Sequence, residues 1–334
     1  MRILVVKLSS LGDLFHALPA VHNLKTGFGA QLDWVVTEAY VDLVRHFTDI
    51  DHVISFPRRN TLARSGPFLR DLRQHRYDLV VDFQGLLKSA IVTRLARTRR
   101  RIGPSFNREC SRWLYTEIAG VRNKARHAVE ENLDVIDHLG LARTPPVFPV
   151  KFPQRMVAGA HPRIAICLSS RWLSKNWPPD RFQAVARYLQ EQHAAAIFLI
   201  GAKSDRALCS AIADGLPGPA INLAGQTTLA EMGGLLQAMD VLVSNDSGPS
   251  HIAAAVGTPC VAVFGPTNPD RTGPYGAMHR VAKTSLPCRP CYRRTCKRPD
   301  IPCITGVQSY QVCELVEEVL ANNGAQPKSE PRVS

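Results

Sequence analysis

The first loop whose side chains could do chemistry follows an apolar run at the start of the chain. Ile3 to Val6 is rich in β-forming residues, and Ser9-Ser10-Leu11-Gly12-Asp13 leads from it into a segment of helical character. Glycine permits close approach of a ligand, and the first turn of a helix offers unpaired backbone amides. A carboxylate held there can act as a general base toward a hydroxyl group. The alternative is that Ser10 or Asp13 only caps the helix, because capping residues of this type are common.

A second loop of this kind lies in the second half of the chain. The apolar run from Val241 to Ser244 leads into Asn245-Asp246-Ser247-Gly248-Pro249 and then into an alanine-rich segment. Several backbone amides converge at such a helix start, which suits a diphosphate. His251 stands near the first turn and could contact the same anion. The alternative for His251 is an ordinary buried histidine.

A third loop also follows an apolar run and precedes a helical segment. It spans Ser169-Ser170-Arg171-Trp172-Leu173-Ser174-Lys175-Asn176-Trp177-Pro178. The ammonium of Lys175 could neutralise phosphate charge on a departing nucleotide. A solvated surface lysine is the alternative interpretation of the same residue.

Alternating β-rich and amphipathic segments must position these loops, and the alternation predicts parallel α/β structure. The expected strands are Ile3–Val6, Leu32–Val36, Val53–Phe56, Leu79–Phe83, Ile164–Leu168, Ile197–Ile200, Ala220–Leu223, Val241–Ser244 and Val261–Phe264. The pattern lapses after Leu141 into a stretch rich in proline and small residues, which we interpret as a linker. We therefore expect two Rossmann-like doubly wound domains, residues 1–150 and 160–322, with the strand ends of both around a shared cleft.

Composition limits the partners of the chain. Of 334 residues, 45% are hydrophobic and 21% charged, which is a globular composition, and the net charge of +13 favours polyanions. Nucleic acid, an anionic membrane surface and a phosphorylated substrate all qualify. No apolar run approaches the roughly 20 residues of a membrane span, and the N-terminus lacks a secretory signal. We therefore expect a cytoplasmic protein.

Nine cysteines in a cytoplasmic chain are expected to be thiols or metal ligands rather than disulfides. Four of them form a Cys-rich loop, residues 286–304, with the spacing Cys288-x2-Cys291-x4-Cys296-x6-Cys303. This count and spacing are compatible with a structural zinc or an iron–sulfur centre. Free thiols in a proline-rich loop are the alternative, and the sequence leaves the metal undecided.

Taken together, the ordered motifs resemble glycosyltransferase family 9, the bacterial ADP-heptose:lipopolysaccharide heptosyltransferases, over nearly the whole chain. The first half looks most like the type I enzyme, which adds the first heptose to Kdo. The motifs are Ile3–Asp13, Asp33–Val36, Asp82–Ser89, Ser174–Pro178, Asn245–His251 and Phe264–Thr267.

This resemblance implies a GT-B fold and an inverting, metal-independent displacement without a cofactor, in which Asp13 is the base and Lys175 lies on the donor phosphates. The residues that would bind the donor are Ser9, Ser10, Gly12, Ser169, Ser170, Asp246, Ser247, Gly248, Pro249 and His251. Candidates for the anionic acceptor are Arg58, Arg59 and Lys88. One departure concerns the ribose: some members carry an acidic residue after Gly201-Ala202, where this chain has Lys203, and Asp205 is a possible substitute.

The expected partners are an ADP-sugar donor, a lipid-linked anionic saccharide acceptor and the cytoplasmic face of the inner membrane, contacted by charge rather than by insertion. A transferase of the same fold that uses another nucleotide sugar is the first alternative. The second is a basic nucleic-acid-binding protein, although the sequence lacks the interleaving of aromatic and basic residues typical of that class.

Overall fold

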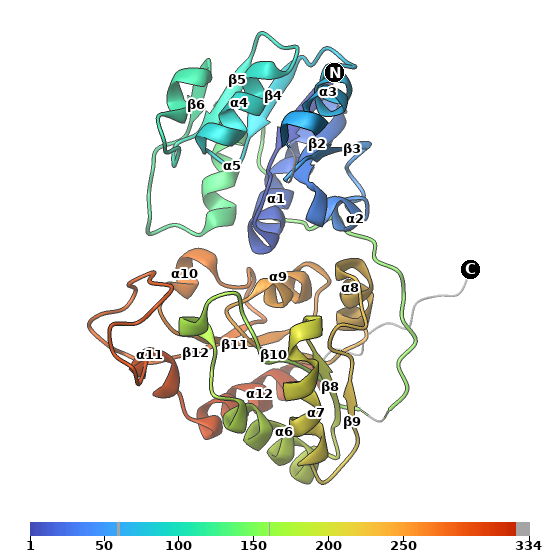
Figure 1. Ribbon diagram of the computed structural model, residues 1–334, viewed down its shortest axis with the longest axis vertical. Helices are drawn as coiled ribbons and strands as arrows, with labels where there is room; N and C mark the ends of the chain where they lie inside the picture. The colour runs from blue at the N-terminus through green and yellow to red at the C-terminus, as the bar shows by residue number, and fades with distance from the viewer. Residues whose placement is uncertain (59–60, 160, 325–334) are drawn as a thin grey trace. The chain divides into compact units, whose positions relative to one another are not determined.

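The computed structural model describes residues 1–58, 61–159 and 161–324. The chain divides into two compact units, Met1–Phe152 and Pro153–Ser334 (Figure 1). Each unit has its own parallel sheet of six strands. No helix within the described part of the chain is long and apolar enough to cross a membrane.

The sheet of the first unit has the strand order β3-β2-β1-β4-β5-β6, and every pairing is parallel. Its strands are β1 (Arg2–Val6), β2 (Gln31–Thr37), β3 (His52–Phe56), β4 (Leu79–Asp82), β5 (Arg101–Pro104) and β6 (Glu117–Ala119). The four strands expected from apolar runs are confirmed. The sequence pattern missed β5 and β6, which are short and follow the arginine-rich stretch.

Helices cover both faces of the first sheet. They are α1 (Leu11–Phe28), α2 (Val41–Val44), α3 (Thr61–Leu72), α4 (Leu87–Leu95) and α5 (Ala128–His138), with 3-10 turns η1 (Glu38–Tyr40) and η2 (Ser111–Leu114). Figure 1 shows α5 alongside α1, and these two helices pack on each other. On the opposite face, Phe68 and Leu72 of α3 and Val92 of α4 share a core with Val6 and Val80 of the sheet.

The second sheet repeats the topology of the first, with the order β12-β11-β10-β7-β8-β9. Its strands are β7 (Arg163–Cys167), β8 (Ala196–Ile200), β9 (Ala220–Asn222), β10 (Val241–Asn245), β11 (Cys260–Phe264) and β12 (Arg280–Lys283). The five strands expected in this half are confirmed, and β12 was missed. The described helical segments are η3 (Leu173–Lys175), α6 (Pro179–His193), η4 (Lys203–Asp205), α7 (Arg206–Asp214), α8 (Leu229–Gln237), α9 (Gly248–Ala255), α10 (Pro269–Thr272), α11 (Pro302–Thr305) and α12 (Ser309–Gly324).

In each sheet the order of the strands reverses direction once, and this switch point determines where loops can form a site. The reversal lies between β1 and β4 in the first unit and between β7 and β10 in the second. The connections from these adjacent strands leave toward opposite faces, which opens a crevice at their carboxyl ends. All three chemistry-bearing loops of the sequence follow one of these four strands.

The segment expected to be a linker is partly attached to the first unit. Thr48 donates its amide to the carbonyl of Pro149, at 2.8 Å between N and O, and Lys151 donates to that of His46, at 2.9 Å. Phe152 is buried. These contacts attach residues 149–152 to the first compact unit, which ends at Phe152.

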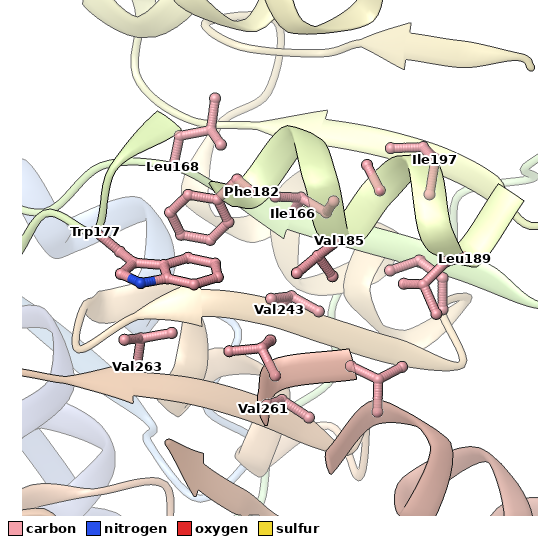
Figure 2. Close-up of a cluster of buried hydrophobic side chains, with 14 of the residues drawn as sticks. Ile166, Leu168, Trp177, Phe182, Val185, Leu189, Ile197, Val243, Val261 and Val263 are labelled. Carbon is pink, nitrogen blue, oxygen red and sulfur yellow. The ribbon is translucent and has the colours of Figure 1, made fainter. Parts of the chain in front are cut away.

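Trp177 anchors the core of the second unit beneath the loop that follows β7 (Figure 2). Its indole ring meets the ring of Phe182 edge-on, with 4.8 Å between centroids. The indole N–H donates to the carbonyl of Val307 at 2.9 Å, so the polar edge of this buried ring is satisfied. Ile166, Val243 and further aliphatic side chains complete the cluster.

Replacing Trp177 with alanine should lower the free energy of unfolding by about 3–5 kcal/mol, because the change opens a large cavity in a packed core. Leu173→Ala is the control, since Leu173 is 75% exposed and should shift the free energy by less than about 0.5 kcal/mol. Denaturant unfolding of both variants measures the difference. Equal effects would contradict the packing described above.

Candidate functional site

Lys7 joins the two loops at the switch point of the first sheet. Its ammonium is buried and donates to the carbonyl of Phe83, which follows β4, at 2.7 Å between Nζ and O. The amide of Ser9 donates to Oε1 of Gln84 at 3.1 Å. The loop after β1 is thereby fixed against the loop after β4. The sequence analysis missed Lys7 and Gln84 as parts of a site.

Asp13 both caps α1 and faces solvent. One carboxylate oxygen, Oδ2, accepts from the amide and the hydroxyl of Ser10, at 2.9 and 2.7 Å. The other oxygen, Oδ1, lies 3.9 Å from Nδ1 of His16, and the side chain of Asp13 is 42% exposed. The capping interpretation is therefore confirmed. It leaves one oxygen of the carboxylate available to a ligand, so it does not compete with a role in catalysis.

The pKa of Asp13 is set by opposing effects. Desolvation by the surrounding protein raises it, but the charge of Lys7 and the hydrogen bond and charge of His16 outweigh that effect, with help from the Ser10 amide. The pKa of Asp13 is therefore lowered well below its ordinary value, and the group is ionised throughout the neutral range. Burial lowers the pKa of Lys7, while the charges of Asp13 and Asp82 oppose this shift.

Asp82, at the end of β4, is a buried carboxylate that organises the second loop. Its Oδ1 accepts from the amides of Gln84 and Gly85, at 2.6 and 3.1 Å, and its Oδ2 accepts from the hydroxyl of Tyr115 at 2.7 Å. Burial raises the pKa of Asp82, although these hydrogen bonds act in the opposite direction. Gly85 has a φ of +68°, a conformation that favours glycine. Asp82 is thus fully engaged in positioning this loop.

In the second unit, the two loops at the switch point meet through an ion pair. Nζ of Lys175 lies 2.6 Å from Oδ2 of Asp246, and the two side chains are 16% and 6% exposed. The hydroxyl of Thr267 donates to the same carboxylate oxygen. The ammonium also lies 4.6 Å from the centroid of the Trp172 ring. Lys175 and Asp246 are therefore brought together, as their positions after β7 and β10 require.

The side chain of Asn245 links the same two loops through hydrogen bonds. Its side-chain nitrogen donates to the carbonyl of Leu168 at 2.7 Å, and its oxygen accepts from the amide of Trp177 at 2.9 Å. Ser170 is turned inward, where its amide and hydroxyl donate to Oδ1 of Asn176 at 2.8 and 2.9 Å. The sequence analysis gave Ser170 a ligand-binding role, and in the structure its side chain holds the turn.

Ser169 points toward the end of the neighbouring strand β8. Its hydroxyl donates to Oδ2 of Asp205 at 2.6 Å, and the amide of Ala202 donates to the same oxygen at 2.7 Å. The acidic side chain considered as a substitute in the sequence thus lies beside a predicted donor residue. Lys203, at the position where some relatives are acidic, is exposed.

Helix α9 begins directly after the β10 loop. Ser247 is its N-cap residue and makes no side-chain cap, while Gly248 and Pro249 open the first turn. The first amides of a helix generally have no partner within it. In α9, Pro249 has no amide hydrogen and the amide of Ser250 donates to the carbonyl of Ser247, so the amides of Ser247 and Gly248 are the candidates for an anion. His251 lies within this helix and is 7% exposed. This burial is compatible with both interpretations of His251: an ordinary buried histidine, or a side chain that touches a ligand through its small exposed part.

Two of the three candidates for acceptor binding lie within the described residues. The ammonium of Lys88 is 4.4 Å from the centroid of the Phe56 ring, which ends β3. Arg58 follows that strand, is exposed, and donates its amide to Oε1 of Glu38 at 3.1 Å. Arg59 lies outside the described residues. Lys88 and Arg58 therefore share the carboxyl edge of the first sheet.

The Cys-rich loop packs against the loops that follow β7 and β11 in its own unit. The guanidinium of Arg289 donates to the carbonyl of Gly265 at 2.5 Å, and the hydroxyl of Ser174 donates to that of Arg293 at 2.8 Å. Cys288 and Cys291 are exposed and Cys303 is buried, and all are free thiols. Among the residues that the structure describes, no group of three or more potential ligands is placed to hold a metal ion.

A family model described as glycosyltransferase family 9 (heptosyltransferase) matches residues 66–301. The chain belongs to glycosyltransferase family 9. The resemblance found in the motifs is thus confirmed, and with it the heptosyltransferase class of enzyme. The family 9 chain is 29% identical over 351 residues to lipopolysaccharide heptosyltransferase 1 of Pseudomonas aeruginosa, covering 96% of this chain and 98% of that protein. It is 27% identical to the Escherichia coli protein of the same name, covering 85% and 93%.

Solved structures of family 9 proteins share the fold. The E. coli heptosyltransferase WaaC with ADP superposes with a TM-score of 0.79 at 25% identity, covering 96% of this chain and 100% of that one. A family 9 glycosyltransferase of Veillonella parvula gives a TM-score of 0.84 at 20% identity, covering 96% and 97%. The expected GT-B fold is therefore confirmed.

Replacing Lys7 with methionine should raise the pKa of Asp13 toward the ordinary value of about 3.9, because the charge that lowers it is removed. Carbon-13 NMR of the side-chain carboxyl during a pH titration measures this pKa. Lys25→Met is the matched control, since Lys25 pairs with Asp51 at 2.7 Å instead. An Asp13 titration identical in both variants would show that Lys7 does not set it.

Proposed function

We propose that this protein transfers heptose from ADP-heptose to the inner core of lipopolysaccharide, with Asp13 as the general base. The observation that carries the proposal is the Asp13 carboxylate, which is ionised by its neighbours, held by Ser10 and still 42% exposed at a switch point. The relatives named as lipopolysaccharide heptosyltransferases and the solved WaaC with ADP support the donor and the reaction class.

The donor diphosphate would lie against the start of α9. The backbone amides around Ser247 and Gly248 would bind its oxygens, and Lys175 would turn from Asp246 toward the same charge. Asp246 keeps the ammonium close to this position before the donor arrives. As ADP departs, Lys175 would stabilise the negative charge that develops on the leaving phosphate. His251 and Pro249 would line this part of the donor site.

The remaining donor contacts would come from loops at the two switch points. Ser169 would lie near the ribose together with Asp205, whose carboxylate already accepts from Ser169 and from Ala202. Ser9, Ser10 and Gly12 would approach the sugar from the loop that carries Asp13. Ser170 would contribute through its backbone, because its hydroxyl is committed to Asn176 and to the carbonyl of Trp172.

The chemical step is a single displacement with inversion. The acceptor hydroxyl loses its proton to Asp13 while its oxygen forms a bond to the anomeric carbon, and the bond from that carbon to the phosphate oxygen breaks. Asp13 is a weak base because its pKa is lowered, so the hydroxyl must become acidic through bond formation before the proton moves. No metal ion takes part in this scheme, since cationic side chains and amides hold the leaving group.

On the acceptor side, Arg58, Arg59 and Lys88 would bind anionic groups of the Kdo region, as in a type I enzyme. The excess of basic residues would also hold the protein on the cytoplasmic face of the inner membrane, where the lipid-linked acceptor resides. Because the ammonium of Lys88, in α4, lies over the ring of Phe56 at the end of β3 and Arg58 follows the same strand, two of these charges could act on one ligand.

A second candidate is the same reaction with another nucleotide sugar. The observation that favours it is the exposed Lys203 at the position where some members of the family have an acidic residue for the ribose. A panel of nucleotide sugars tested with one acceptor distinguishes the two candidates, because the transferred sugar changes the mass of the product.

Replacing Asp13 with asparagine should lower kcat by about 10²–10⁴, because the general base is lost while an oxygen remains to accept from Ser10. Binding of ADP should stay within about twofold of the wild type, since no atom of the diphosphate site changes. Single-turnover transfer and calorimetry with ADP measure the two quantities.

The matched control is Asp42→Asn, an exposed carboxylate in the first turn of α2 with no assigned role. It should leave both transfer and ADP binding unchanged. Wild-type turnover by the Asp13→Asn variant would refute the assignment of the base.

A further inference from the structure

Helices α3 and α4 enclose an apolar groove on the outer face of the first unit. The cavity has a volume of about 430 Å³. Its apolar walls come from Phe56, Phe68, Leu69, Leu87, Ile91 and Leu95. Lys88, a candidate for acceptor binding, stands among them and covers the ring of Phe56. The groove therefore reaches the carboxyl edge of the sheet, where the anionic acceptor is expected.

The α4 side of the groove is an apolar stripe left exposed to solvent. Leu87, Ile91 and Leu95 follow one another at intervals of four residues, so they lie on one face of the helix. They are 41%, 45% and 39% exposed. A contiguous row of exposed aliphatic side chains is the kind of surface that can meet another apolar phase. The turn η2, which packs against α4, carries Trp113 at 83% exposure, and tryptophan is typical of membrane interfaces.

A basic cluster borders the apolar groove. Two neighbouring cavities of about 960 and 880 Å³ are lined by exposed arginines, and they share Leu95 and Leu69 with the groove. These arginines are Arg70, Arg73, Arg76, Arg94, Arg97 and Arg99.

Three carboxylates lie along these surfaces: Asp78 and Asp71 line the two arginine cavities, and Glu109 lines the groove. Each of them already has a polar partner. Asp78 accepts from the amide of Arg2 at 2.7 Å, and Glu109 accepts from the amide of Leu87 at 3.2 Å. Oδ1 of Asp71 lies 3.8 Å from Nε2 of His52. Six guanidinium groups against three carboxylates leave the border of the groove positive.

We propose that this surface binds an anionic phospholipid leaflet, with hydrocarbon in the α3–α4 groove and lipid phosphates on the arginine cluster. The presence of an apolar groove beside a basic cluster selects a lipid surface over other binding partners. Nucleic acid would satisfy the arginines but has no hydrocarbon for the groove, and a neutral apolar partner would leave the arginines without counter-charges. Lipid headgroups carry their negative charge directly above the acyl chains, in the same arrangement as the cluster and the groove.

This binding mode goes beyond the contact by charge proposed above, because part of its free energy comes from burial of apolar side chains. The two contributions respond differently to salt. Raising the salt concentration from 0.1 M to 1 M shortens the Debye length from about 10 Å to about 3 Å. This screening weakens the contacts between arginines and lipid phosphates and leaves the apolar contact intact.

Co-sedimentation of the full chain with vesicles of phosphatidylglycerol and phosphatidylcholine, at 0.1 M and 1 M NaCl, tests the proposal. The wild type should bind at both salt concentrations. The Ile91→Asn, Leu95→Asn variant should bind at least about tenfold more weakly at 1 M NaCl. The Arg94→Ala, Arg97→Ala variant should lose affinity at 0.1 M and match the wild type at 1 M.

Leu208→Asn is the matched control, because Leu208 is a 38% exposed leucine on helix α7 of the other unit. It should bind like the wild type. Absence of wild-type binding to these vesicles, or unchanged binding by the Ile91→Asn, Leu95→Asn variant, would overturn the proposal. So would a dimer in solution that this variant abolishes, because the groove would then be occupied by a second copy of the chain. Transfer to a deacylated acceptor separates this test from that of the proposed function, since the groove variant should retain it.

Discussion

The buried charge of Lys7 is the interaction on which the N-terminal site depends. An ammonium removed from water is costly unless anions and hydrogen bonds compensate it. The ammonium of Lys7 donates one hydrogen bond to the carbonyl of Phe83, and the charges of Asp13 and Asp82 compensate its own charge. The same arrangement fixes the loop after β1 against the loop after β4 and keeps Asp13 ionised. Folding of this sheet edge and preparation of the proposed base are therefore one event.

In the second unit, different residues hold together the two loops at the switch point. Asn245 joins the loops after β7 and β10 by neutral hydrogen bonds, and Lys175 pairs with Asp246 above them. The two side chains are 16% and 6% exposed, and Asp246 stands directly before Ser247, the N-cap residue of α9. In the proposed donor complex, a diphosphate would replace the carboxylate as the partner of Lys175. The first site thus carries an anion held by its neighbours, and the second carries a cation whose partner in the structure is Asp246.

Most of the fold could be predicted from the sequence because central parallel strands are continuous apolar runs. The edge strands β6 and β12 escaped prediction, since each is short and carries charges such as Glu117 and Arg280. The sequence placed Asp13 and Asp246 correctly after their strands, because polar residues that follow an apolar run mark the end of a strand. Lys7 was missed because its burial depends on a carbonyl 76 residues away in the chain. The apolar groove was missed for the same reason, since it requires the pairing of α3 with α4.

The most direct test of the account is to incubate the protein with ADP-heptose and Kdo-lipid A and to follow the acceptor by mass spectrometry. The account predicts a product heavier by one heptose residue, with one ADP released for each product formed. Hydrolysis of ADP-heptose without a heavier acceptor, or no reaction at all with the folded protein, would contradict it.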